Sequence, residues 1–146
     1  MATQVHHLNC GAMRPPGGAL FDGVTPGLGS AALACHCLLL EVPDGLVLVD
    51  AGVVGQNARQ SRAAHHPAFL AVENPRLDER ESAAVRIRTL GLRPDDVWHI
   101  VMTHPDFDHA AGTCGWCAHM IRAGLMRHLC GTCSRFLVQK AGSLFV

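Results

Sequence analysis

The stretch VMTHPDFDHAAG, residues 101–112, gathers two histidines and two aspartates directly after an apolar run. The four side chains are His104, Asp106, Asp108 and His109. A loop at the end of a strand can turn such residues towards one centre, and imidazole and carboxylate together suit zinc, iron or manganese. A bound cation lowers the pKa of its water from 15.7 to about 7 and polarises a carbonyl oxygen. The spacing therefore predicts a metal site and favours hydrolysis as the reaction class.

A simpler interpretation of the same residues stays open. Asp106 and Asp108 could cap the following helix, with the two histidines as ordinary polar loop residues. One aspartate is enough for a cap, however, and so dense a cluster would repel itself or stay idle without a cation. The metal site is therefore the favoured interpretation.

The residues before this motif predict an alternation of strands and helices. Apolar runs at 34–42 and 46–50, joined by Pro43, Asp44 and Gly45, are typical of a β-hairpin. Residues 4–9 predict an edge strand, and the Gly- and Pro-rich residues 13–29 predict a loop.

A helix and a further strand lead into the motif. Asp78 is the expected N-cap, with Glu79 and Glu81 in the first turn and Gly91 as the stop. The helix presents an apolar stripe of Ala83, Ile87 and Leu90. Residues 97–102 then predict a buried strand ending just before His104. An α/β fold with its chemistry at the carboxyl end of a strand is the expected class.

Composition limits the partners. The chain has 146 residues with a formal net charge of zero, which fits one core and offers no basic face for nucleic acid or an anionic membrane. No leader or membrane-spanning run is apparent, so we expect a cytoplasmic protein acting on a small molecule. Seven cysteines, an odd number, favour a reducing compartment.

The composition changes abruptly after residue 112. All twelve acidic residues lie at or before Asp108, and residues 113–146 carry both CxxC pairs, CGWC and CGTC. We expect residues 1–112 to form the α/β unit and 113–146 an atypical tail. Either the tail arose through a shifted reading frame or divergent truncation, which the composition favours somewhat, or it is a small segment in which four thiolates hold one structural zinc. Those thiolates belong to Cys114, Cys117, Cys130 and Cys133.

The stretch THPDFDHAAG resembles the THxHxDHxGG signature of the metallo-β-lactamase-fold hydrolases, and LLLEVPDGLVLVDAG resembles the hairpin that opens that fold. The resemblance implies the first half of an αββα sandwich, with His104 and Asp106 on one divalent metal and Asp108 and His109 on a second. Asp50 would support the metal ligands without binding the metal itself. A metal-activated water, oriented by Asp108, would attack a lactone, ester, thioester or similar carbonyl.

Two departures from the family pattern modify this expectation. Asp106 replaces a histidine, as in the flavodiiron branch, so iron or manganese becomes plausible beside zinc. The chain ends 37 residues after His109 without another acid, so we expect weaker metal binding than in a complete homologue and an inactive chain on its own.

Half a sandwich also exposes a sheet face, which predicts a homodimer or aggregation. The competing class is a non-enzymatic or vestigial protein with zinc held only by the tail.

Other residues carry weaker expectations. His6 and His7 should point to opposite faces of a strand. Cys35 and Cys37 should fill the core. Phe69 and Leu70 should either line the approach to the site or pack in the core.

Overall fold

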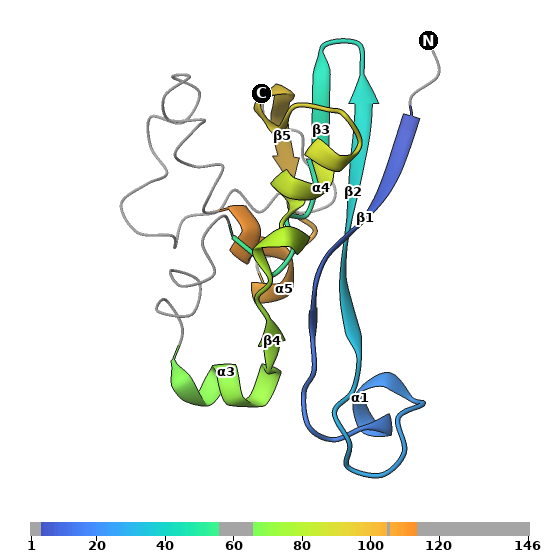
Figure 1. The fold of residues 1–146 in the computed structure, drawn as a ribbon, viewed down its shortest axis with the longest axis vertical. Helices are drawn as coiled ribbons and strands as arrows, with labels where there is room; N and C mark the ends of the chain where they lie inside the picture. Colours follow the sequence, from blue (N-terminus) through green and yellow to red (C-terminus); the bar gives the residue numbers. More distant parts are fainter. Residues whose placement is uncertain (1–3, 56–65, 105, 114–146) are drawn as a thin grey trace.

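The computed structural model describes residues 4–55, 66–104 and 106–113. These residues contain one five-stranded sheet with the strand order β4-β1-β2-β3-β5 (Figure 1). The strands are β1 (Gln4–Met13), β2 (Leu33–Val42), β3 (Gly45–Val49), β4 (Pro75–Arg76) and β5 (Val97–Val101). The helices are α1 (Ala19–Asp22), α3 (Pro67–Glu73), α4 (Ala83–Thr89) and α5 (Phe107–Ala110), with 3₁₀ turns at Glu79–Glu81, Pro94–Asp96 and Ala111–Thr113. The α/β class expected from sequence is confirmed.

The predicted hairpin is formed by β2 and β3. These strands pair antiparallel from Leu38 opposite Val49 to Val42 opposite Gly45. Gly45 has a φ of 143°, and an added Cβ would lie 2.3 Å from Trp98 Cδ1, so only glycine fits where the indole covers the turn. β5 then pairs with β3 in parallel, which brings the carboxyl ends of both strands to one edge of the sheet.

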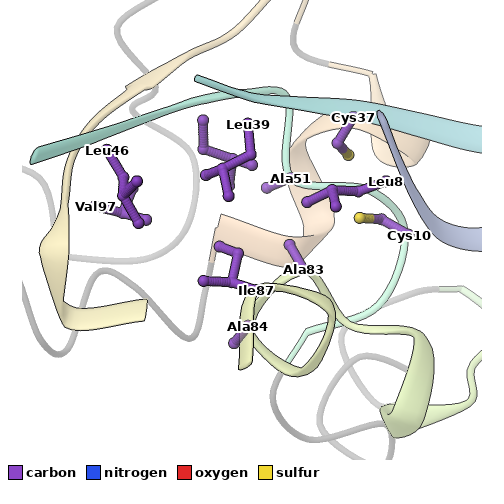
Figure 2. Close-up of a cluster of buried hydrophobic side chains, with 11 residues drawn as sticks. Leu8, Cys10, Cys37, Leu39, Leu46, Ala51, Ala83, Ala84, Ile87 and Val97 are labelled. Carbon is purple, nitrogen blue, oxygen red and sulfur yellow. The ribbon is translucent and has the colours of Figure 1, made fainter. Parts of the chain in front are cut away.

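The core lies between the sheet and α4. Ala83, Ala84 and Ile87 of the helix face Leu8 and Leu39 of the sheet (Figure 2). Ser82 caps α4, because its hydroxyl accepts a hydrogen bond from the Val85 N–H at 3.4 Å.

Three expectations about elements need correction. The helix does not begin at Asp78: a 3₁₀ turn follows that residue, and extended backbone at Ser82 separates it from α4. Leu90 is 42% exposed rather than part of the buried stripe. Residues 97–101 form a strand, but it is not a buried one, because among the described strands β5 lies at an edge of the sheet and pairs with β3 alone.

The amino-terminal region also differs in extent. β1 runs four residues beyond the predicted strand, through a bulge between Asn9 and Ala12, and at that far end it also pairs with β4. The predicted loop at 13–29 contains the single helical turn α1. None of the described helices is long and apolar enough to cross a membrane.

Candidate metal centre

The polar cluster forms where β3 and β5 end side by side. Asp50 follows β3, while His104 and Asp106 lie in the connection between β5 and α5. Asp108 and His109 belong to α5, which is a single turn of four residues. The parallel pairing of β3 with β5 therefore brings together residues separated by more than fifty positions in the sequence.

Asp50 anchors this connection. Its Oδ1 accepts the Thr103 N–H at 2.8 Å, and its Oδ2 accepts the Thr103 hydroxyl at 2.8 Å. The same Oδ2 lies 2.8 Å from Nδ1 of His109. Asp50 is buried and adopts a φ of 59°, in the left-handed region that an aspartate occupies more readily than most residues. The carboxylate thus fixes both the end of β5 and one histidine.

Backbone hydrogen bonds fasten α5 to the segment that follows β3. The Ala51 N–H donates to the His109 carbonyl at 2.8 Å, and the Gly112 N–H donates to the Gly52 carbonyl at 2.8 Å. A Cβ on Gly112 would lie 1.9 Å from the carbonyl oxygen of Ala51, so only glycine allows the two segments to approach this closely.

The four predicted ligands are neighbours in space. His109 Nε2 lies 3.2 Å from Asp108 Oδ2, and His104 Nδ1 lies 3.3 Å from Asp106 Oδ2. The two imidazole rings lie with their centroids 3.8 Å apart. His104 Nδ1 is buried and has no hydrogen-bond partner among the described residues. Its contact with Asp106 Oδ2 is therefore close but is not a hydrogen bond. An unsatisfied buried nitrogen of this kind suits a ligand, because a bound group would supply the missing partner.

The donor atoms of these side chains contact one another rather than one common point. Within residues 4–55, 66–104 and 106–113, no group of three or more histidine, cysteine, aspartate or glutamate side chains is arranged to hold a metal ion. The residue types and the unpartnered His104 nitrogen fit a divalent cation, whereas the arrangement does not show one. Metal binding by His104, Asp106, Asp108 and His109 therefore stays a prediction.

The helix-capping alternative finds little support at Asp106. This residue occupies the N-cap position of α5, but its side chain makes no capping hydrogen bond. The Asp106 carboxylate therefore remains available for another role.

Two further residues of the site were missed at the sequence level. Thr103 binds Asp50 through both its N–H and its hydroxyl, and its place as the first residue of THPDFDH was the available signal. Phe107 meets Phe69 of α3 edge to face, with ring centroids 5.2 Å apart, and packs against a cluster of Cys35, Val53 and Val54. Phe69 thus packs against a residue of α5, whereas its expected role in lining the approach to the site stays a prediction.

The remaining candidates lie away from the cluster. His6 is 2.7 Å from Glu41, whereas His7 stacks on His36 across the other face, as expected for adjacent residues of a strand. Cys35 and Cys37 are buried, and burial raises the pKa of the Cys35 thiol to about 12, with a contribution from the charge of Asp108. The tail cysteines lie outside the described residues.

A surface depression lies far from this cluster. It has a volume of about 350 Å³, is lined by Asp44, Trp98 and His99 among others, and sits at the opposite end of β3 and β5. Its lining lacks the paired imidazoles and carboxylates of the cluster, which therefore remains the stronger candidate for chemistry.

Comparison with known proteins gives consistent results. The family model of the metallo-beta-lactamase superfamily matches residues 31–119. A probable metallo-hydrolase of Mycobacterium tuberculosis is 43% identical over 116 residues, covering 75% of this chain and 31% of the relative. An N-acyl homoserine lactonase of Bacillus thuringiensis is 31% identical over 81 residues, covering 55% of this chain and 32% of the relative. The chain therefore spans about a third of the length of these curated relatives.

Solved structures agree with the sequence matches. An N-acyl homoserine lactone hydrolase, with the product N-hexanoyl-L-homoserine bound at its catalytic metal centre, superimposes with a TM-score of 0.57 at 26% identity. The match covers 79% of this chain and 46% of that structure. The described part of this chain thus shares its fold with about half of that hydrolase.

Proposed function

This chain belongs to the metallo-beta-lactamase superfamily, and from that premise we propose that it carries the metal-binding half of a lactone-opening hydrolase. The ligands in this proposal are His104, Asp106, Asp108 and His109. One or two divalent ions would be held, zinc first, with iron or manganese as alternatives because Asp106 adds a carboxylate. When bound, such an ion supplies a Lewis acid and an activated water.

The contact between Asp50 and His109 is the observation that carries the proposal. Metal-binding histidines typically donate the N–H of their other ring nitrogen to a carboxylate, which fixes the tautomer and the ring orientation. Asp50 Oδ2 lies 2.8 Å from His109 Nδ1 and is itself held by Thr103. With the proton on Nδ1, the lone pair of His109 Nε2 points towards Asp108, which is also a proposed ligand.

The other residues take complementary roles. His104 presents a buried nitrogen without a hydrogen-bond partner among the described residues, which suits a ligand. Asp108 is 29% exposed at its side chain, so its carboxylate can accept a hydrogen bond from the attacking water and orient it. Asp50 positions His109 and does not touch the reacting atoms.

The substrate we propose is a lactone that carries an apolar acyl chain; esters and thioesters are the alternative carbonyl substrates. Phe69 and Phe107 form an apolar surface beside the proposed ligands, which suits an acyl group better than a charged one. The relatives named as N-acyl homoserine lactonases act on molecules of this type. The chain spans about a third of such relatives, so we expect its own turnover to fall well below theirs.

Metal titration of the full chain tests this proposal. Zinc binding is measured by calorimetry for the wild type, for His109→Ala and for the control His7→Ala, which changes an exposed histidine elsewhere on the sheet. We expect His109→Ala to weaken zinc binding and His7→Ala to leave it unchanged. Equal affinity in all three proteins would remove His109 from the site.

Hydrolysis is measured separately, with an N-acyl homoserine lactone and with p-nitrophenyl acetate. We expect slow, chelator-sensitive opening of the lactone at most. Rapid turnover by the purified chain that is lost in Asp108→Ala would support the metal site and contradict the expected inactivity.

A second candidate function rests on the tail. Its two CxxC pairs have a spacing typical of structural zinc sites. In that case residues 113–146 form a zinc-binding segment beside the unit of residues 1–112, and the protein is a non-enzymatic binding module.

A further inference from the structure

The sheet has a second apolar face, opposite α4. Side chains alternate along a strand, so the residues of β1 and β2 that do not face the core share this other side. The registers of β3 and β5 extend the surface across the sheet. We call it the open face, and its apolar members are Val5, Leu38, Leu40, Val47, Val49 and Val101.

The open face carries no formal charge. Four strands contribute to it, and Glu41 is the only Asp, Glu, Lys or Arg residue in them; it lies on the other face beside His6. Its polar side chains include His7 and His36, which stack on each other at a centroid distance of 5.0 Å. Val5 and Val101 are 47% and 42% exposed. A sheet face exposed to water normally carries polar or charged residues in alternation with the apolar ones of the buried face, whereas strands buried on both sides have continuous apolar runs such as CLLL at 37–40.

We propose that the open face is an interface between two copies of this chain. A symmetric dimer places the same patch against itself, which an uncharged face tolerates and a charged face resists. Two such sheets would stack about 10 Å apart, as in a β-sandwich, with a copy of α4 on each outer side. This inference does not depend on the proposed hydrolase activity.

The size of the face fits this occupant. β1 and β2 have ten residues each and β3 and β5 five each. At about 3.3 Å per residue and about 4.8 Å between strands, the flat area is on the order of 500 Å². Side-chain relief raises the accessible area above that value, towards the roughly 800 Å² per partner that stable complexes bury.

A second exposed apolar surface provides a matched control. The segment around α1 exposes Leu20, Val24 and Leu28 to at least 80%, and it lies at the end of the β1–β2 pair opposite the β2–β3 hairpin (Figure 1). A Val24→Lys substitution therefore changes the same residue type to the same charge on a different surface.

Sedimentation velocity of the full chain over a range of micromolar concentrations tests the proposal. We expect the wild type and Val24→Lys to sediment at twice the 15.6 kDa chain mass. Val101→Lys should raise the dimer dissociation constant by about tenfold or more, because it places an unpaired charge in a dry contact. Val5→Lys provides an independent second variant at the other edge of the face, and circular dichroism confirms that each variant is folded.

Three results would overturn the proposal. The first is a wild type that remains monomeric at every concentration measured. The second is a dimer that persists in both open-face variants. The third is a dimer that dissociates in Val24→Lys instead.

Discussion

Asp50 combines a constrained backbone with three hydrogen-bond contacts. Its positive φ has an energetic cost, and residues held in such conformations cluster at functional sites. Its two oxygens contact the Thr103 N–H, the Thr103 hydroxyl and His109 Nδ1. A carboxylate can accept all three hydrogen bonds, whereas an amide of the same shape has only one acceptor oxygen.

The variant Asp50→Asn should therefore weaken both the fold and the metal site. We expect the free energy of unfolding to fall by about 1–3 kcal/mol, because one buried donor loses its acceptor. Zinc affinity should fall about 10- to 100-fold, the usual effect of losing a carboxylate behind a histidine ligand. Urea denaturation and calorimetry measure the two effects. Asp44→Asn, in the exposed hairpin turn, is the control, and an equal loss in that variant would contradict the assignment.

Cys35 gives a pH dependence that needs no metal. Burial raises the pKa of its thiol from 9.0 to about 12, so the folded state keeps a proton that the unfolded state releases. Between pH 9 and 12 the unfolded chain binds fewer protons, and stability falls as the pH rises. In urea denaturation followed over this range, Cys35→Ala should reduce the pH slope. An unchanged slope would show that other groups cause the loss.

At the level of elements, the sequence predicted correctly those features that depend on a few consecutive residues. The apolar runs on both sides of Pro43, Asp44 and Gly45 allowed only a tight antiparallel turn, and β2 and β3 form it. The predicted start of α4 was wrong because Asp78 and Ser82 are both good N-cap residues. The sequence alone does not show that Asp78 caps only a 3₁₀ turn and that Ser82 caps the helix. The exposure of β5 depends on its place at the sheet edge, which is a property of topology.

Helix α4 and the turn after it offer a matched pair of substitutions. Ile87 is fully buried against the sheet (Figure 2), whereas Leu90 is 42% exposed. Ile87→Ala should lower the free energy of unfolding by about 2–5 kcal/mol, since it removes buried methyl groups and leaves a cavity. Leu90→Ala should cost far less. Urea denaturation compares them, and equal losses would mean that α4 does not cover the core as described.

At the scale of the whole molecule, the sequence predicted the location of the candidate site better than its geometry. The motif at 104–109 was expected to follow a strand, and the family resemblance placed Asp50 in support of it. The structure brings them together at one sheet edge, because β3 and β5 are parallel and end side by side. The directions of the donor atoms could not be predicted, because they depend on contacts between side chains such as Asp106 with His104. Thr103 was missed because its role, donating two hydrogen bonds to the Asp50 carboxylate, depends on a contact between residues that are distant in the sequence.

The number of zinc ions bound by each chain distinguishes the two sources of ligands that the sequence offers. If the cluster at the carboxyl ends of β3 and β5 is the site, the double variant His104→Ala/His109→Ala should lose the bound zinc. The variant Cys114→Ser/Cys130→Ser should then keep it, because imidazole and carboxylate ligands are untouched. Elemental analysis after dialysis measures zinc per chain, and His7→Ala controls for adventitious histidine binding. The opposite pattern, in which the cysteine variant loses all zinc and the histidine variant keeps it, would assign the metal to the tail and refute the hydrolase site. Loss of a part of the zinc in each variant would support the proposed site and add a structural zinc in residues 113–146.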